Sequence, residues 1–236
     1  MKKLAIFVEG QTERIFVEAL IAHCAGNSNV QITSRRGNLG RKHKRIFFEV
    51  NAIEIGTGDE FFILVIDSGS DGSVTSDIKE LYKNMIRENY SLIFGLRDVR
   101  PKFSLQDVEK LRRGIAATME FILELPVQFH LAIMEIEAWF LAENTHFRRF
   151  DRRLTQRKIV SELGFFPDDD VAETREDPSQ DLDRIHGIVG KSYDKSNAVV
   201  SKVVGSLSYQ NLAIQHSIKI RDLGCLVNGL NTFFEG

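Results

Sequence analysis

Two runs of consecutive apolar residues, each followed at once by an acidic residue, constrain the fold of this sequence most. Leu4–Val8 is followed by Glu9, and Phe61–Ile66 is followed by Asp67. Uninterrupted apolar runs of this length are typical of strands that are buried on both faces, as in parallel sheets covered by helices. The sequence therefore predicts an α/β fold in which buried strands end in carboxylates.

Further strands and helices are expected to alternate along residues 1–137. This order favours a mostly parallel, Rossmann-like sheet, followed by a helical C-terminal region, residues 138–236, packed on it. A basic stretch at residues 34–45 is expected to be a loop that runs into a helix. The other expected strands are 30–33, 91–96 and 127–134, and helical apolar spacing is found near residues 15–20, 78–86 and 105–123.

The composition is that of a globular protein. Of 236 residues, 43% are hydrophobic and 27% are charged, and the net charge is −2, which excludes a disordered chain or a polycation. No apolar run is long enough for a transmembrane helix, and the N-terminus lacks the pattern of a signal peptide. Cys24 and Cys225 form no CxxC pair and are expected to be reduced thiols. We therefore expect a cytoplasmic protein with no membrane partner.

Acidic side chains follow several of the expected strands. In open α/β sheets, ligands bind beyond the carboxyl ends of the strands. The acids at these positions are Glu9, Asp67, Asp71, Glu135 and Glu137. Clustered carboxylates repel one another unless a cation lies among them, and Mg²⁺ prefers such oxygen ligands. The pattern favours a magnesium site, while helix capping and solvated loops are the alternative roles for these acids.

The segment around Glu9 resembles a known motif. Ile6–Glu13, with the sequence IFVEGQTE, resembles the opening motif of the Toprim domain, which topoisomerases, primases and a set of nucleases share. That family binds Mg²⁺ through a glutamate after the first strand and a DxD pair after the third. For this chain the resemblance implies Mg²⁺, with Mn²⁺ as the alternative ion. The resemblance implies that Glu9 and Asp67 are catalytic metal ligands. Gly69 stands at the second DxD position, so Asp71 is the nearest acid that could substitute.

Two later segments resemble one bacterial Toprim-like family found beside ABC-type or SMC-like ATPases and linked to phage defence. They are residues 135–143, EIEAWFLAE, and a tail with Pro178, Leu182 and Tyr193–Lys195. The resemblance implies a metal-dependent nuclease that is the effector of an ATPase-associated defence system. It implies that Glu135 and Glu137 complete a second metal site and that Lys195 contacts phosphate. The alternative is a non-catalytic sensing or scaffolding subunit of an ATPase complex with a degenerate Toprim site.

Positive charge is concentrated in the basic stretch. Six cations and no acid occur in eleven residues: Arg35, Arg36, Arg41, Lys42, Lys44 and Arg45. Such a stretch is typical either of a solvated loop or of contacts with the phosphates of a nucleic acid. We expect it to bind DNA or RNA, and a second arginine cluster at residues 148–158 is the other candidate. A homo-oligomer is also compatible with the sequence.

Overall fold

The computed structural model describes residues 1–39, 45–70, 72–119, 124–168 and 174–235. Asp71, Arg41, Lys42 and Lys44 lie outside the described residues. The chain divides into two compact units. The first unit comprises residues 1–97, 109–131 and 228–236, and the second comprises residues 98–108 and 132–227. Each unit therefore combines stretches from both sides of residue 137, the predicted boundary.

A six-stranded sheet, with the strand order β3-β2-β4-β1-β5-β6, organises the first unit. β1 pairs in parallel with β4 and with β5, and β2 pairs in parallel with β4. This mostly parallel sheet confirms the predicted α/β class. The strands are β1 (Lys2–Val8), β2 (Val30–Leu39), β3 (Arg45–Ile55), β4 (Phe61–Asp67), β5 (Leu92–Asp98) and β6 (Val127–Ala132).

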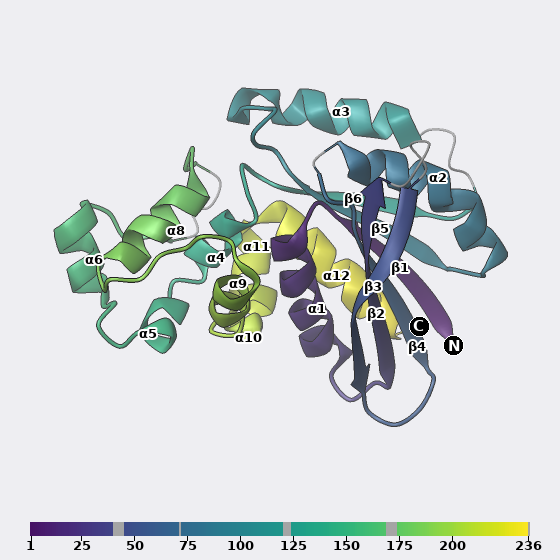
Figure 1. Cartoon of the computed structure of the whole chain (residues 1–236), viewed down its shortest axis with the longest axis horizontal. Coiled ribbons are helices and arrows are strands. Elements are labelled where there is room, and N and C mark those ends of the chain that lie inside the picture. Colours follow the sequence, from purple (N-terminus) through teal and green to yellow (C-terminus); the bar gives the residue numbers. More distant parts are fainter. Residues whose placement is uncertain (40–44, 71, 120–123, 169–173, 236) are drawn as a thin grey trace. The chain divides into compact units, whose positions relative to one another are not determined.

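Helices cover both faces of the sheet, which explains why its central strands are apolar throughout. Residues 4–8 of β1 and 63–67 of β4 are all buried. Alternate residues of β1, Ala5 and Phe7, pack with α2 (Ser73–Arg87), whereas their neighbours point to the other face. α1 (Gln11–Ala25) contacts β2 and β4, and it lies on the opposite side of the sheet from α2 (Figure 1).

The basic stretch is the part of the sheet that the sequence pattern did not predict. The expectation of a loop leading into a helix is wrong for the described part of residues 34–45, because β2 continues through Leu39 and β3 begins at Arg45. β2 and β3 pair antiparallel, with an irregularity between Ser34 and Arg35. Backbone hydrogen bonds to two neighbouring strands hold this charged segment extended, so it needs no run of apolar side chains.

The remaining elements are helical, and most of them belong to the second unit. The turn η2 (Leu105–Asp107) leads into α3 (Val108–Met119), as expected from the helical spacing. None of the helices in the described part of the chain has the length and apolar composition needed to cross a membrane. The other helices are α4 (Glu137–Ala142), α5 (His146–Phe150), α6 (Gln156–Leu163), α8 (Pro178–Gly187), α9 (Asn197–Val204), α10 (Tyr209–Asn211), the π-helical turn η3 (Leu212–His216), α11 (Ser217–Lys219) and α12 (Arg221–Glu235).

Candidate functional site

The ends of β1 and β4 bring two predicted site residues to one edge of the sheet. Val8 is in register with Asp67, and the backbone N–H of Ser68 donates to the carbonyl of Val8 at 2.9 Å. Glu9, the next residue after Val8, therefore lies at the same edge of the sheet as Asp67. Asp67 is only 1% exposed, and Glu9 is half-buried. We call these two residues the edge carboxylates.

Asp67 has a cationic neighbour as well as a backbone donor. Its Oδ1 accepts from the N–H of Gly69 at 2.9 Å, and its Oδ2 lies 3.7 Å from Nε of Arg36. Arg36 is next to Asp67 because the parallel register of β2 and β4 pairs the two residues. Burial raises the pKa of the Asp67 carboxyl, whereas Arg36, the Gly69 N–H, Arg14 and Arg45 act in the opposite direction. A buried carboxylate close to cations is therefore the main electrostatic feature of this edge.

A second buried acid, Glu18, was not predicted as part of the site. Its Oε1 accepts from Arg14 on the same helix and from Ser34 of β2, both at 2.6 Å, and its Oε2 accepts from Asn51 of β3 at 2.9 Å. Each oxygen of Glu18 thus has a partner, so this acid fastens α1 to the β2–β3 hairpin. The four-residue spacing of Arg14 and Glu18 was the only signal of this network in the sequence.

The edge carboxylates have the donor chemistry that a hard divalent cation requires. Among the described residues, no group of three or more His, Cys, Asp or Glu side chains is arranged to hold a metal ion, and Asp71 lies outside them. Mg²⁺ commonly binds through only one or two carboxylates together with waters and substrate phosphates. Two oxygen donors on adjacent strand ends, one of them buried, therefore fit such an ion.

The described cations of the basic stretch are used in different ways. Arg35 is exposed, and Arg36 lies beside Asp67. Arg45 is occupied within the protein, because its guanidinium binds both oxygens of Asp77 at 2.9 and 2.5 Å and the carbonyl of Ser68 at 2.6 Å. Arg45 therefore fastens β3 to α2, and Arg35 and Arg36 are better placed to meet a phosphate.

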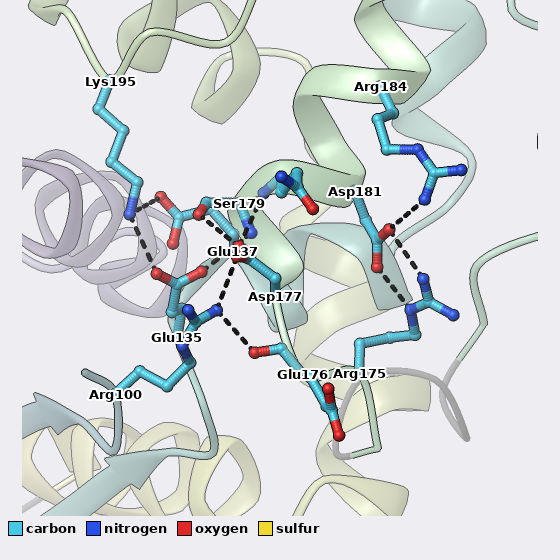
Figure 2. A network of polar contacts seen from close by, with 11 residues as sticks. Arg100, Glu135, Glu137, Arg175, Glu176, Asp177, Ser179, Asp181, Arg184 and Lys195 are labelled. Atoms are coloured by element: carbon cyan, nitrogen blue, oxygen red, sulfur yellow. Dashed lines mark hydrogen bonds and ion pairs between the residues drawn. The ribbon is translucent and has the colours of Figure 1, made fainter. Parts of the chain in front are cut away.

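In the second unit, the structure brings together three further predicted residues, Glu135, Glu137 and Lys195 (Figure 2). Nζ of Lys195 lies 3.1 Å from Oε1 of Glu137 and 3.6 Å from Oε1 of Glu135. The hydroxyl of Tyr193 also donates to Oε1 of Glu137, at 2.8 Å. We call these four residues the Glu137 cluster.

Glu137 differs from an ordinary structural acid in its unsatisfied oxygen. The side chain is fully buried, and its Oε2 has no hydrogen-bond partner among the described residues. Glu143 is also fully buried, but it accepts hydrogen bonds from Thr145, Arg149, Ser208 and Asn211. A buried polar atom without a partner is uncommon in native proteins and needs an explanation, such as an ion or a catalytic role.

Charges within the Glu137 cluster shift each other's protonation. Burial raises the pKa of Glu137, Lys195 opposes that shift, and the neighbouring Glu135 adds to it. Desolvation lowers the pKa of Lys195, but the Glu137 and Glu135 carboxylates outweigh it and leave this pKa raised. Lys195 is therefore a firmly protonated ammonium, although its side chain is 43% exposed.

The backbone around the Glu137 cluster adopts conformations that side chains usually avoid. Met134 and Lys195 have positive φ angles of 64° and 55°, in the left-handed region that favours glycine. Beyond Met134, the N–H of Ile136 donates to Oδ1 of Asp98 at 2.9 Å, which fixes the start of α4. Non-glycine residues held in this region are enriched at functional sites, where surrounding contacts enforce them.

Ionic contacts around α8 fix the neighbouring loop. Oε2 of Glu135 accepts from the N–H of Ser179 at 2.9 Å, and Arg100 pairs with Asp177 at 3.0 Å. Asp181 binds two guanidiniums, those of Arg175 and Arg184 (Figure 2). Glu135 is therefore held by a helix N-terminus on one side and by Lys195 on the other.

The fold and these two sets of acids define an α/β protein with carboxylates at its strand ends. The chain belongs to the family described as Domain of unknown function (DUF4276), whose model matches residues 8–208. No curated protein is detectably similar to this chain.

One solved structure, described as the "putative cell surface hydrolase" from Lactobacillus plantarum WCFS1, shares 7% identity and a TM-score of 0.28 over 67% of this chain. The match spans 63% of the length of that protein. So low a similarity carries no inference about the present chain.

Proposed function

We propose that this chain is a metal-dependent nuclease that hydrolyses phosphodiester bonds of DNA or RNA, with Glu9 and Asp67 as its ligands for Mg²⁺ or Mn²⁺. The observation that supports the proposal is the register of β1 and β4, which pairs Val8 with Asp67 and so brings Glu9, the next residue, to the same edge of the sheet as Asp67. The resemblance of Ile6–Glu13 to the Toprim motif supports the same assignment.

The two edge carboxylates differ in burial, and this difference suits them to different tasks. Asp67, buried and fixed by the Gly69 N–H, would serve as an ordered metal ligand. Glu9, half-buried, would serve as a ligand or accept a proton from the attacking water. A bound divalent ion would polarise the phosphodiester and lower the pKa of a bound water. Arg36 would offset the negative charge of the substrate, and Asp71 is proposed as a further ligand.

The acids of the second unit extend the proposal. Glu135 and Glu137 would provide a second set of oxygen ligands, and the unsatisfied Oε2 of Glu137 supports this assignment. Lys195 would contact a phosphate group of the nucleic acid. On the resemblance to the defence-linked family, we place the nuclease in the cytoplasm as the effector partner of an ABC-type or SMC-like ATPase.

The test is cleavage of labelled DNA and RNA with Mg²⁺ or Mn²⁺, before and after the change Glu9→Gln. Loss of a ligand or proton acceptor is expected to slow cleavage by about 100-fold or more. Glu88→Gln, at an exposed residue outside both sets of acids, is the matched control. Cleavage at the wild-type rate by a folded Glu9→Gln protein would overturn the assignment.

A non-catalytic subunit is the second candidate, and one observation favours it. Asp67 is already bound by the Gly69 N–H and lies 3.7 Å from Arg36, so an internal cation is close to the position that a metal ion would take. In that case neither Mg²⁺ nor Mn²⁺ would raise the melting temperature. Metal-dependent stabilisation that disappears in Asp67→Asn would exclude this candidate.

A further inference from the structure

A polar cavity of about 460 Å³ opens beside the edge carboxylates, wholly within the first unit. Its walls come from the end of β2, the turn after β4 and the first turns of α2, and they include Arg36, Ser68, Ser70, Ser73 and Glu80. The volume is within the range of pockets that bind small molecules. Hydroxyl and charged groups predominate among these residues, so an apolar ligand would be a poor match.

Arg36 is the cation in this wall that the protein leaves available. Arg45 also lines the cavity, but Asp77 and the carbonyl of Ser68 already occupy its guanidinium. The side chain of Arg36 forms no hydrogen bond with a described residue, lies 3.7 Å from the Asp67 carboxylate and is 51% exposed. Its guanidinium can therefore donate a pair of hydrogen bonds to an oxyanion.

Ser68 provides an independent sign of a missing ligand. The residue is 1% exposed, and its Oγ has no hydrogen-bond partner among the described residues. Buried hydroxyls are nearly always paired with protein or with an ordered molecule. A hydroxyl that has no partner in the wall of a polar cavity is a donor that a bound anion would satisfy.

The start of α2 adds a favourable field for an anion. This helix has fifteen residues, its first turn contains no acid, and its N-cap, Gly72, offers no side-chain hydrogen bond. The hydroxyls of Ser70 and Ser73 lie 2.7 Å apart at this end. A helix N-terminus without an acidic cap attracts phosphate through its dipole and its N–H groups.

We propose that this cavity binds a phosphate monoester of a nucleotide, held by Arg36, Ser68 and the N-terminus of α2. This proposal rests on the proposed nuclease function, in which the cavity would be the subsite for the terminal phosphate of a nucleic-acid strand. Glu80 lies on the same face of α2 as Ser73, two turns further on, and it supplies an acceptor for a sugar hydroxyl. This carboxylate favours a nucleotide over inorganic phosphate, which has no sugar.

Fluorescence anisotropy with labelled single strands that carry a 5′-phosphate, a 3′-phosphate or neither tests the proposal. The buffer contains a chelator, so binding does not depend on a catalytic metal. One phosphorylated strand is expected to bind about 10-fold more tightly than the unphosphorylated strand, the value of one charge-assisted hydrogen-bonded contact. A nucleoside monophosphate that competes as strongly as the strand would identify a free nucleotide as the ligand.

Variants separate binding from folding. Arg36→Gln should abolish the preference for phosphate, whereas Arg87→Gln, at the other end of α2, should preserve it. Ser73→Asp places an acid at the N-terminus of α2, where a negative charge stabilises the helix. A loss of phosphate binding in this variant would therefore come from repulsion of the phosphate and not from unfolding. Ser68→Ala removes a hydroxyl that makes no hydrogen bond with a described residue, so it should weaken binding without lowering the melting temperature.

The outcomes also separate this proposal from the nuclease function. Equal affinity for all three strands, with no saturable binding of the monophosphate, would overturn the phosphate subsite even if the protein cleaves nucleic acid. A phosphate preference that Arg36→Gln removes would support the subsite even if no cleavage is found. Glu9→Gln should keep the preference, because Glu9 does not line the cavity.

Discussion

Replacing Lys195 by Met tests how the Glu137 cluster is held together. Lys195 and Tyr193 both contact Oε1 of Glu137, at 3.1 and 2.8 Å, and Oε2 has no hydrogen-bond partner among the described residues. Without the ammonium, this fully buried carboxylate would keep the hydrogen bond from Tyr193 but lose the cation that neutralises its charge. We therefore expect Lys195→Met to reduce the free energy of unfolding.

The expected decrease in the free energy of unfolding depends on how deeply the Glu137–Lys195 ion pair is buried. Breaking a fully buried ion pair costs about 3–5 kcal/mol, but the Lys195 side chain is 43% exposed and water screens it. We expect a loss of about 1–2 kcal/mol after this discount. Adding Glu137→Gln should recover most of the loss, because the unpaired charge is then gone.

The assay is urea unfolding of the wild type, the two single variants and the double variant. Lys83→Met, at an exposed lysine on α2, is the control and should change the stability by less than about 0.5 kcal/mol. The loss in Lys195→Met should shrink toward pH 5, because a Glu137 pKa raised above its unfolded value adds stability as the pH falls. A coupling energy of zero in the double-variant cycle would refute the reasoning.

Three further predictions concern stability and charge. Burial lowers the pKa of His186 to about 4. The free energy of unfolding, measured with urea, should therefore fall by about 2 kcal/mol between pH 7 and pH 5, and this fall should be absent in His186→Gln. Gly95→Ala should lower the melting temperature because its Cβ would lie 2.5 Å from a ring carbon of a neighbouring phenylalanine, whereas Gly114→Ala, with open space, should raise it. Arg35→Ser should flatten the log–log salt dependence of nucleic-acid binding by about 0.7–0.9 without loss of stability, whereas Arg45→Ser should destabilise the fold.

The central strands could be predicted from the sequence because burial on both faces requires apolar side chains at every position. Residues 4–8 and 61–66 show this directly, and the acids that follow them were predicted with them. The β2–β3 hairpin could not be predicted in the same way. Its charged residues are held extended by backbone pairing to neighbouring strands, and Ser34 is buried against an acid of α1. A pattern of apolar residues cannot predict such polar and backbone contacts.

The Glu137 cluster shows a second limit of the sequence. Glu135 and Glu137 were singled out as acids that follow an expected strand, and Lys195 by resemblance, whereas the contact of Glu137 with Lys195, 58 positions later in the sequence, depends on the tertiary fold. The left-handed conformations of Met134 and Lys195 likewise could not be predicted from residue propensities, since neither residue type favours them. The use of Arg45 as a structural tie, not a surface cation, also became evident only from its contacts with Asp77.

The division of the chain into two units has a consequence for how the gene can be dissected. The chain passes between the units after residues 97, 108, 131 and 227, and these points fall within β5, α3, β6 and α12. Three of these points lie one residue from the end of β5, the start of α3 and the end of β6, whereas the last one divides α12 near its middle. A fragment that ends after residue 227 would therefore separate the first half of α12 from its continuation. Because neither unit is one continuous stretch of the chain, neither can be expressed as a single uninterrupted segment of the gene, and their roles are better separated by point substitutions than by truncation.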